Sequence, residues 1–129
     1  MKLWVDDVRP TPEGYVWCKS VRTAKFRIEQ LETFRQNMIS SFEVAYESGR
    51  YDDADVCASI LDNERYQIEL IDIDHDAGDY AIYGGDYIKL LDWLEETGRN
   101  YPIRIHSMNP VGVANMRAII KRNGWKEVM

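Results

Sequence analysis

The sequence predicts an α/β domain in which a mostly parallel sheet of about five strands lies between two layers of helices, a three-layer architecture. Two observations support this prediction. Short apolar segments of strand length alternate along the chain with longer segments of helical periodicity. The chain has 129 residues, 45% of them hydrophobic, which suffices for one compact core. We therefore treat residues 1–129 as a single domain.

Five short apolar segments have the length and composition of strands. They are residues 2–5, 15–18, 68–73, 103–105 and 125–128. Pro10, Pro12 and Gly14 separate the first two segments and exclude a helix between them. The first connection is therefore expected to be a stiff loop.

Apolar residues recur at helical spacing from Val21 onward, and Gly49 is expected to end this long helical stretch. A further helix follows, with Asp52 or Asp53 as its cap. The sequence thus predicts a helical insertion at about residues 35–65, before the central strand.

Two more helices are expected after the central strand. One has its apolar face at residues 87–94 and ends near Gly98. The other begins at Pro110, with Asn109 as its cap, and ends at Gly124.

Polar clusters follow three of the predicted strands. They are Asp6-Asp7, Asp72 to Asp76, and His106 to Asn109. The carboxyl ends of parallel strands meet at one edge of a sheet, where α/β proteins place their sites. We therefore expect the three clusters to converge there.

Carboxylates dominate the expected site. Asp72 and Asp74 would lie on one face of the central strand, and two carboxylates about 4 Å apart repel by roughly 4 kcal/mol at an effective dielectric near 20. A cation would offset this repulsion. Asp6, Asp7 and Asp74 are oxygen donors of the kind that Mg²⁺ or Mn²⁺ prefers. Alternatively, Arg9 or loop N–H groups satisfy the cluster.

The chain has two histidines, His75 and His106, and each directly follows a strand inside a polar cluster. Imidazole exchanges protons near neutral pH, so the pair is suited to act as acid and base. We interpret both, together with Asp74, as catalytic candidates. The sequence does not assign the acid role to one of them.

Three further polar residues are candidates for holding a phosphate. Arg9 has forked donors that suit a phosphate, although a surface ion pair explains it equally well. Ser107 and Asn109 lie where a helix start would direct N–H groups toward the sheet edge. Asn109 is expected to cap that helix in either case.

Aromatic residues have two interpretations. The tryptophans expected in the core are Trp4, Trp17 and Trp93. Tyr80 and Tyr83 occur in a glycine-rich loop at residues 78–85. They either stack on a base or are ordinary exposed loop tyrosines.

The formal net charge of −6 argues against broad binding to duplex nucleic acid, so a nucleic-acid partner is expected to be small or a strand end. Cys18 and Cys57 fit no metal-ligand spacing, and no apolar run suggests a signal or membrane segment. We expect a cytoplasmic protein with free thiols and no membrane role. The helical insertion at residues 35–65 is a candidate surface for a protein partner.

Three segments, Leu3 to Gly14, Asp74 to Gly78 and His106 to Gly112, resemble the cyclic-phosphate-processing receiver domains. That family is a divergent branch of response-regulator receivers, so the resemblance implies a receiver or flavodoxin-like fold. By position, it implies that Asp6, Asp7 and Asp74 hold metal or phosphate. Ser107 would take the hydroxyl role, while the lysine of ordinary receivers has no match, since Lys126 lies in the last predicted strand.

The resemblance also implies action on phosphoesters or cyclic phosphates, with the two histidines added to the receiver site. We hypothesise a small phosphoesterase that hydrolyses a cyclic phosphate on a nucleotide or RNA end. A metal-free mechanism with two histidines is a variant of the same hypothesis. The alternatives are a binding module for a phosphorylated ligand that does not react with it, and a signalling receiver phosphorylated on Asp74.

Overall fold

The computed structural model describes residues 1–129 and contains one parallel sheet with the strand order β2-β1-β3-β4. Its strands are β1 (Lys2–Val5), β2 (Tyr15–Cys18), β3 (Leu70–Ile73) and β4 (Ile103–Ile105). The predicted α/β fold with a parallel sheet is confirmed, but the sheet has four strands, not five. The expected fifth strand meets β4 only through an isolated bridge between Ile103 and Glu127.

Four α-helices and two short 3-10 helices complete the fold. They are α1 (Val21–Glu47), α2 (Tyr51–Asp62), η1 (Glu64–Tyr66), η2 (Gly78–Tyr83), α3 (Ile88–Glu96) and α4 (Pro110–Asn123). The predicted glycine-rich loop is therefore mostly the 3-10 helix η2. The predicted boundaries of α4 are confirmed, because Asn109 accepts a hydrogen bond from the Gly112 N–H and Gly124 adopts a left-handed conformation. No helix combines the length and the apolar character needed to cross a membrane.

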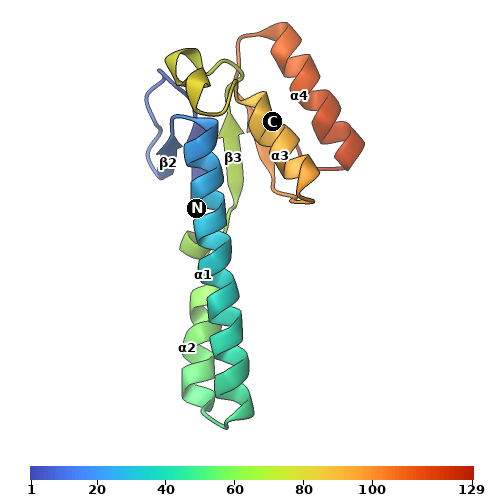
Figure 1. Cartoon of the computed structure of the whole chain (residues 1–129). Helices are drawn as coiled ribbons and strands as arrows, with labels where there is room; N and C mark the ends of the chain where they lie inside the picture. Colours follow the sequence, from blue (N-terminus) through green and yellow to red (C-terminus); the bar gives the residue numbers. More distant parts are fainter.

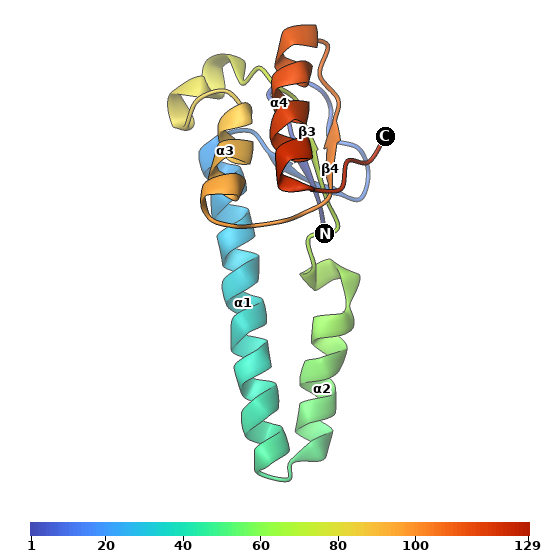
Figure 2. The ribbon, with the colours of Figure 1, turned by 90° about the vertical axis from the view of Figure 1, so that its right-hand side faces the viewer.

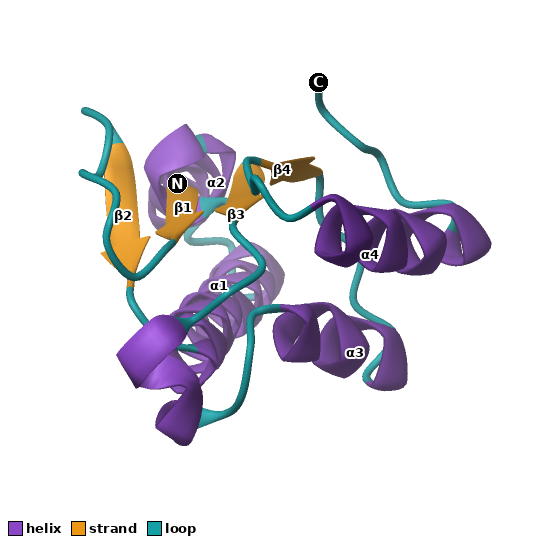
Figure 3. Cartoon of the chain, turned by 90° about the horizontal axis from the view of Figure 1, so that it is seen from above, coloured by secondary structure: helices purple, strands orange, loops and turns teal.

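Helices α1, α3 and α4 lie on the same side of the sheet (Figure 3). Parallel crossovers are right-handed, and those from β2 to β3 and from β3 to β4 run in the same direction across the sheet. Only the β1 to β2 connection runs the other way, and it is the proline-containing loop rather than a helix. The second helical layer expected from the sequence is therefore missing over the other face.

The two faces of the sheet differ accordingly. Leu3, Ile71 and Ile103 are in register on the helix-covered face and are fully buried. Trp4, Asp72 and Arg104 are in register on the helix-free face. The alternation of side chains along each strand thus gives one apolar face and one face of mixed polar and aromatic residues.

Helix α1 has 27 residues and is about 40 Å long. Its far half and α2 form an arm that extends beyond the amino ends of the strands (Figure 1 and Figure 2). The small residues Ala45 and Ala54 are buried where the two helices pack. The predicted helical insertion is confirmed in outline, although α1 continues through residue 35 without a break, so the arm is an extension of α1 together with α2.

The arm carries the net charge of the chain. Residues 36–64 include seven acidic side chains and one basic side chain, a formal charge of −6, so the rest of the chain is formally neutral. The negative charge thus lies at the opposite end of the molecule from the carboxyl ends of the strands (Figure 1). Binding of a protein partner by the arm stays a prediction.

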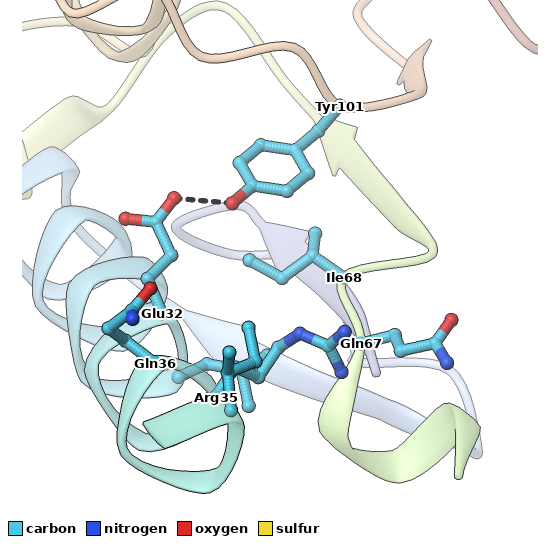
Figure 4. A pocket seen from close by; sticks show the side chains of 8 residues that line it. Glu32, Arg35, Gln36, Gln67, Ile68 and Tyr101 are labelled. Carbon is cyan, nitrogen blue, oxygen red and sulfur yellow. Dashed lines mark hydrogen bonds between the residues drawn. The ribbon is translucent and has the colours of Figure 1, made fainter. Parts of the chain in front are cut away.

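A pocket of about 310 Å³ lies where the arm joins the sheet (Figure 4). Tyr101 donates a hydrogen bond to Glu32, and Arg99 binds the same carboxylate through two nitrogens. Arg35 donates to the carbonyls of Leu61 and Tyr66. These polar groups are already paired with one another, so their contacts connect the arm to the sheet. We call this group of Glu32, Arg35, Arg99 and Tyr101 the joint of the arm.

The joint predicts a pH-dependent stability. Burial opposes ionisation of Glu32, but hydrogen bonds from Arg99 and Tyr101 outweigh it and lower the pKa of this carboxyl. Replacing Glu32 with Gln is expected to lower the free energy of unfolding by about 1–2 kcal/mol at pH 7, measured by urea denaturation.

The loss should be constant above about pH 4.3, the usual pKa of glutamate, and should shrink as the pH falls through the lower pKa of the folded state. Glu43→Gln, at an exposed position of the arm, is the control. Equal losses in the two variants at pH 7 would contradict the role of the joint.

Candidate functional site

The carboxyl ends of three neighbouring strands form one cluster. The hydrogen bonds between the strands continue one residue beyond β3 and β4. The Asp74 N–H donates to the Val5 carbonyl, and the His106 N–H donates to the Ile73 carbonyl. This register brings together one side chain from each strand end. Ligand atoms of Asp6, Asp74 and His106 lie within 4.8 Å of one another. The predicted convergence of the clusters is therefore seen in the structure.

The His106 ring is held on three sides. Its Nδ1 lies 2.6 Å from Oδ1 of Asp72, and its Nε2 lies 2.8 Å from Oδ2 of Asp6. The ring stacks on Trp4 with the centroids 3.9 Å apart and the planes 1° from parallel. Both ring nitrogens of His106 therefore lie within hydrogen-bond distance of a carboxylate oxygen, and the stacking fixes the plane of the ring.

Asp72 is 1% exposed although it lies on the helix-free face of the sheet. A buried carboxylate is costly without partners. Besides His106, it has the Tyr15 hydroxyl at 3.4 Å and the Arg104 guanidinium at 3.9 Å. Side chains from β2 and β4 thus cover and satisfy Asp72 in place of a helix.

Asp6 is fully buried and each of its oxygens has partners. Oδ1 accepts hydrogen bonds of 2.9 Å from the N–H groups of Val8 and Arg9, and Oδ2 faces His106. Burial acts to raise the pKa of Asp6, but these hydrogen bonds outweigh it and lower the pKa below its usual value. Asp6 is therefore held as an anion by the loop that follows β1.

Asp7 is in the opposite situation. Burial raises the pKa of Asp7, and the nearby charges of Asp6 and Asp74 raise it further. Gly78 has a φ of +53°, a conformation that favours glycine, and a Cβ atom there would lie 2.5 Å from Oδ2 of Asp7, so η2 approaches this carboxylate closely. Asp7 thus borders the cluster and is electrostatically coupled to it, but it lies outside the group of Asp6, Asp74 and His106.

Arg9 spans the cluster from the loop after β1. Its guanidinium donates to the His106 carbonyl and lies 3.7 Å from Oδ2 of Asp6 and 3.9 Å from Oδ2 of Asp74. The side chain is 37% exposed, so its remaining donors reach solvent. Arg9 partly neutralises the carboxylates and keeps donors for an anion at the edge of the sheet where the strands have their carboxyl ends, which we call the rim.

His75 belongs to a second, adjacent group. Its Nδ1 lies 2.9 Å from Oδ1 of Asp76, and Asp86 completes the group. The ring packs against the first turn of α4, where a Cβ atom at Gly112 would lie 2.5 Å from it. His75 therefore lies toward the helix-covered side of the sheet, whereas His106 lies over the helix-free face.

Ser107 and Asn109 both act in the capping of α4. The Ser107 hydroxyl accepts from the Asn109 N–H at 3.1 Å, and the Asn109 side chain accepts from the Gly112 N–H at 3.0 Å. Pro110 has no N–H, so Val111 supplies the one N–H of this turn without an acceptor in the chain. Within the first turn of α4, Val111 thus offers the single N–H that is free for a ligand.

The residues present fit a divalent cation, but with a ligand set that differs from the predicted one. Asp6 and Asp74 offer carboxylate oxygens and His106 offers Nε2, while Asp72 on Nδ1 is the outer carboxylate that commonly orients a metal-binding histidine. One nitrogen donor suits Mn²⁺ better than Mg²⁺. The predicted ligand Asp7 is not one of these three residues but is electrostatically coupled to Asp6 and Asp74, and its role as a ligand stays a prediction.

A comparison with protein families matches residues 1–122 to the model of the cyclic-phosphate processing receiver domain. The match covers nearly the whole chain, including all three strand-end clusters. The chain belongs to this family. No curated protein and no solved structure matches this receiver domain. Its Lys126 does not take the place of the receiver lysine, because the Lys126 carbonyl accepts from the Ile103 N–H at the amino end of β4.

Sequence reasoning missed two parts of the receiver site. The sequence predicts a core position for Trp4, and the side chain is buried, yet its ring face also supports His106. For Asp72 the sequence predicts only repulsion from Asp74, whereas in the structure its carboxylate bonds to Nδ1 of His106 and orients the ring. The two-residue spacing of Trp4 to Asp6 and of Asp72 to Asp74 places each pair on one face, a signal that could have revealed both roles.

The charge on Asp7 predicts a gain in stability on its removal. Because burial and neighbouring charges raise its pKa, the ionised carboxylate destabilises the folded state at neutral pH. Asp7→Asn is expected to raise the midpoint of thermal unfolding at pH 7. The gain should fade as the pH falls toward about 3.9, below which Asp7 is protonated in both states. Asp55→Asn on the arm should not show this pattern.

The contact of His75 with α4 predicts that Gly112 cannot be enlarged. In an ordinary helix Gly→Ala is stabilising, but here the added methyl would meet the His75 ring. Gly112→Ala is expected to destabilise the protein by about 1–3 kcal/mol in urea and to shift the NMR signals of the His75 ring. Asn115→Ala, on an exposed position of the same helix, is the control. Increased stability in Gly112→Ala would show that His75 does not pack here.

Proposed function

We propose that this receiver domain is a phosphoesterase that hydrolyses a cyclic phosphate to a linear phosphomonoester. The observation that carries the proposal is the placement of His106 between Asp72 and Asp6, beside Asp74 and Arg9. A histidine whose two ring nitrogens contact carboxylates, beside an arginine with exposed donors, is suited to donate a proton to a leaving oxygen.

His106 is assigned the role of the general acid. Asp72 binds Nδ1, so the proton that is available for transfer is the one on Nε2, which faces the cluster of Asp6 and Asp74. Stacking on Trp4 holds the ring in this orientation. Asp72 and Trp4 are thus positioning residues for His106.

His75 is assigned the role of the general base. Its Nδ1 is engaged by Asp76, which leaves Nε2 to accept a proton from water. His75 lies toward the helix-covered side and His106 over the helix-free face, so a phosphate at the rim would lie between them. Displacement at phosphorus needs the attacking and leaving oxygens on opposite sides, and the placement of the two histidines toward different faces of the sheet supports this assignment.

The proposed reaction balances without a co-reactant other than water. Water loses a proton to His75 and its oxygen forms a bond to phosphorus. One of the two ring ester bonds breaks, and His106 donates a proton to the departing oxygen. The product keeps the second ester bond as a linear monoester.

The exposed donors of Arg9 and the Val111 N–H are the groups proposed to hold the phosphate oxygens. Ser107 contributes through the cap that sets the position of this turn. A divalent cation, when held by Asp6, Asp74 and His106, would supply further stabilisation of charge on the phosphorus oxygens. In that case His106 would be a ligand and the acid role would pass to another group, so the effect of a chelator decides between the two forms of the proposal.

Phosphorus NMR tests the proposal. The protein is incubated with a panel of 2′,3′-cyclic and 3′,5′-cyclic nucleotides, first with Mn²⁺ and Mg²⁺ and then with a chelator. Conversion of at least one substrate to a linear monophosphate is expected. His106→Ala and His75→Ala should each lower kcat by at least 100-fold, and Asp72→Asn by about 10- to 100-fold, with KM little changed.

Asp55→Asn on the arm is the matched control for Asp72→Asn and should retain wild-type turnover. Turnover that survives in both histidine variants would contradict the proton-transfer roles. Binding of a cyclic nucleotide without conversion of any substrate would instead favour a module that binds a phosphorylated ligand.

A further inference from the structure

We infer that a second pocket beside the strand-end cluster is a subsite for a nucleobase, which makes the substrate a nucleotide or an RNA end. This inference deepens the proposed function and rests on it for the reaction, but not for binding. The pocket has a volume of about 270 Å³. It is lined by Lys19, Ser20, Arg22, Thr23, Tyr80 and Tyr83.

The pocket combines aromatic faces with positive charge. The Lys19 ammonium lies 5.6 Å from the centroid of the Tyr80 ring, and the Arg22 guanidinium lies 5.4 Å from that of Tyr83. Bases stack on aromatic side chains, and neighbouring cations attract the phosphates of the same nucleotide. The volume of the pocket is close to the lower end of the range found for small-ligand sites, which suits one base with its ribose.

Contacts connect the pocket to the catalytic cluster. The prediction that Trp17 lies in the core is wrong, because its side chain is 47% exposed. Its indole nitrogen donates to the Asp6 carbonyl at 2.7 Å. The Lys19 ammonium lies 5.6 Å from the centroid of that same Trp17 ring. On the other side, Gly78 at the start of η2 lies so close to Asp7 that a Cβ atom added there would be 2.5 Å from Oδ2, and Tyr80 follows two residues later. A nucleotide could therefore reach both places at once.

The walls of the pocket are preformed. The Tyr87 hydroxyl donates to the Lys19 carbonyl at 2.8 Å and fixes the chain after β2. Gly84, with φ +117°, lets η2 approach the start of α1 so closely that a Cβ atom would lie 2.9 Å from Val21. A preformed site loses less entropy on binding than a mobile loop.

The distribution of charge supports an anionic ligand at this end of the molecule. The formal charge of −6 resides in the arm, and the remaining residues are formally neutral. The arm lies beyond the opposite ends of the strands (Figure 1). The net charge of the chain therefore does not oppose a nucleotide at the rim, where Lys19, Arg22 and Arg9 provide local positive charge.

The test compares two cyclic phosphates that differ in the base. The kcat/KM for adenosine 2′,3′-cyclic phosphate is measured against that for glycerol 1,2-cyclic phosphate, which has no base. The wild type is expected to prefer the nucleotide. Tyr80→Ala and Lys19→Ala should each reduce this preference by about 10-fold, while Tyr51→Ala, an exposed tyrosine of the arm, should leave it unchanged.

Binding of adenosine alone is measured in parallel by saturation-transfer NMR, because it requires no reaction. Adenosine binding that is lost in Tyr80→Ala supports the subsite even if no cyclic phosphate is hydrolysed, in which case only the proposed function fails. Equal turnover of the two substrates, with a ratio that neither variant changes and no binding of adenosine, would overturn the subsite while leaving the phosphoesterase intact.

Discussion

The pairing of His106 with two buried carboxylates is the interaction on which the rest of the site depends. Asp72 on β3 and Asp6 directly after β1 are almost fully buried, and the two ring nitrogens of His106 bond to one carboxylate each. The parallel register makes this geometry available, because the residues after β1 and β4 lie beside β3. A ring held in this way is already ordered for the proton transfer that we propose.

The loss of helices from one face of the sheet explains the unusual surroundings of this histidine. In a sheet covered on both sides, a helix would pack on Trp4 and Asp72. Here the first connection is a proline-containing loop, so that face is covered by its own side chains and by the His106 ring. The same short loop returns Arg9 to the carboxylates. A loop in place of a helix between β1 and β2 thus leaves this face without a helix and also brings Arg9 to the carboxylates.

The arm and the rim differ in their charge and in the side chains that they present. The arm holds the excess of negative charge, whereas the rim holds a compensated cluster of carboxylates, histidines and cations. Since electrostatic interactions are screened over about 8 Å at physiological ionic strength, charge on the far end of a 40 Å helix has little influence at the rim. An acidic chain can therefore present a local site for phosphate.

The sequence by itself determined the parallel α/β fold, the arm and the convergence of Asp6, Asp74 and His106, because hydrophobic periodicity and the shared direction of parallel strands are local or topological properties. It also placed the ends of α4, since Asn109 and Gly124 act within one turn. Only the tertiary structure decided the pairing of His106 with Asp72, the place of Trp17 at the surface and the one-sided helical layer. These depend on strand order and on contacts between residues far apart in the chain, which no local pattern encodes.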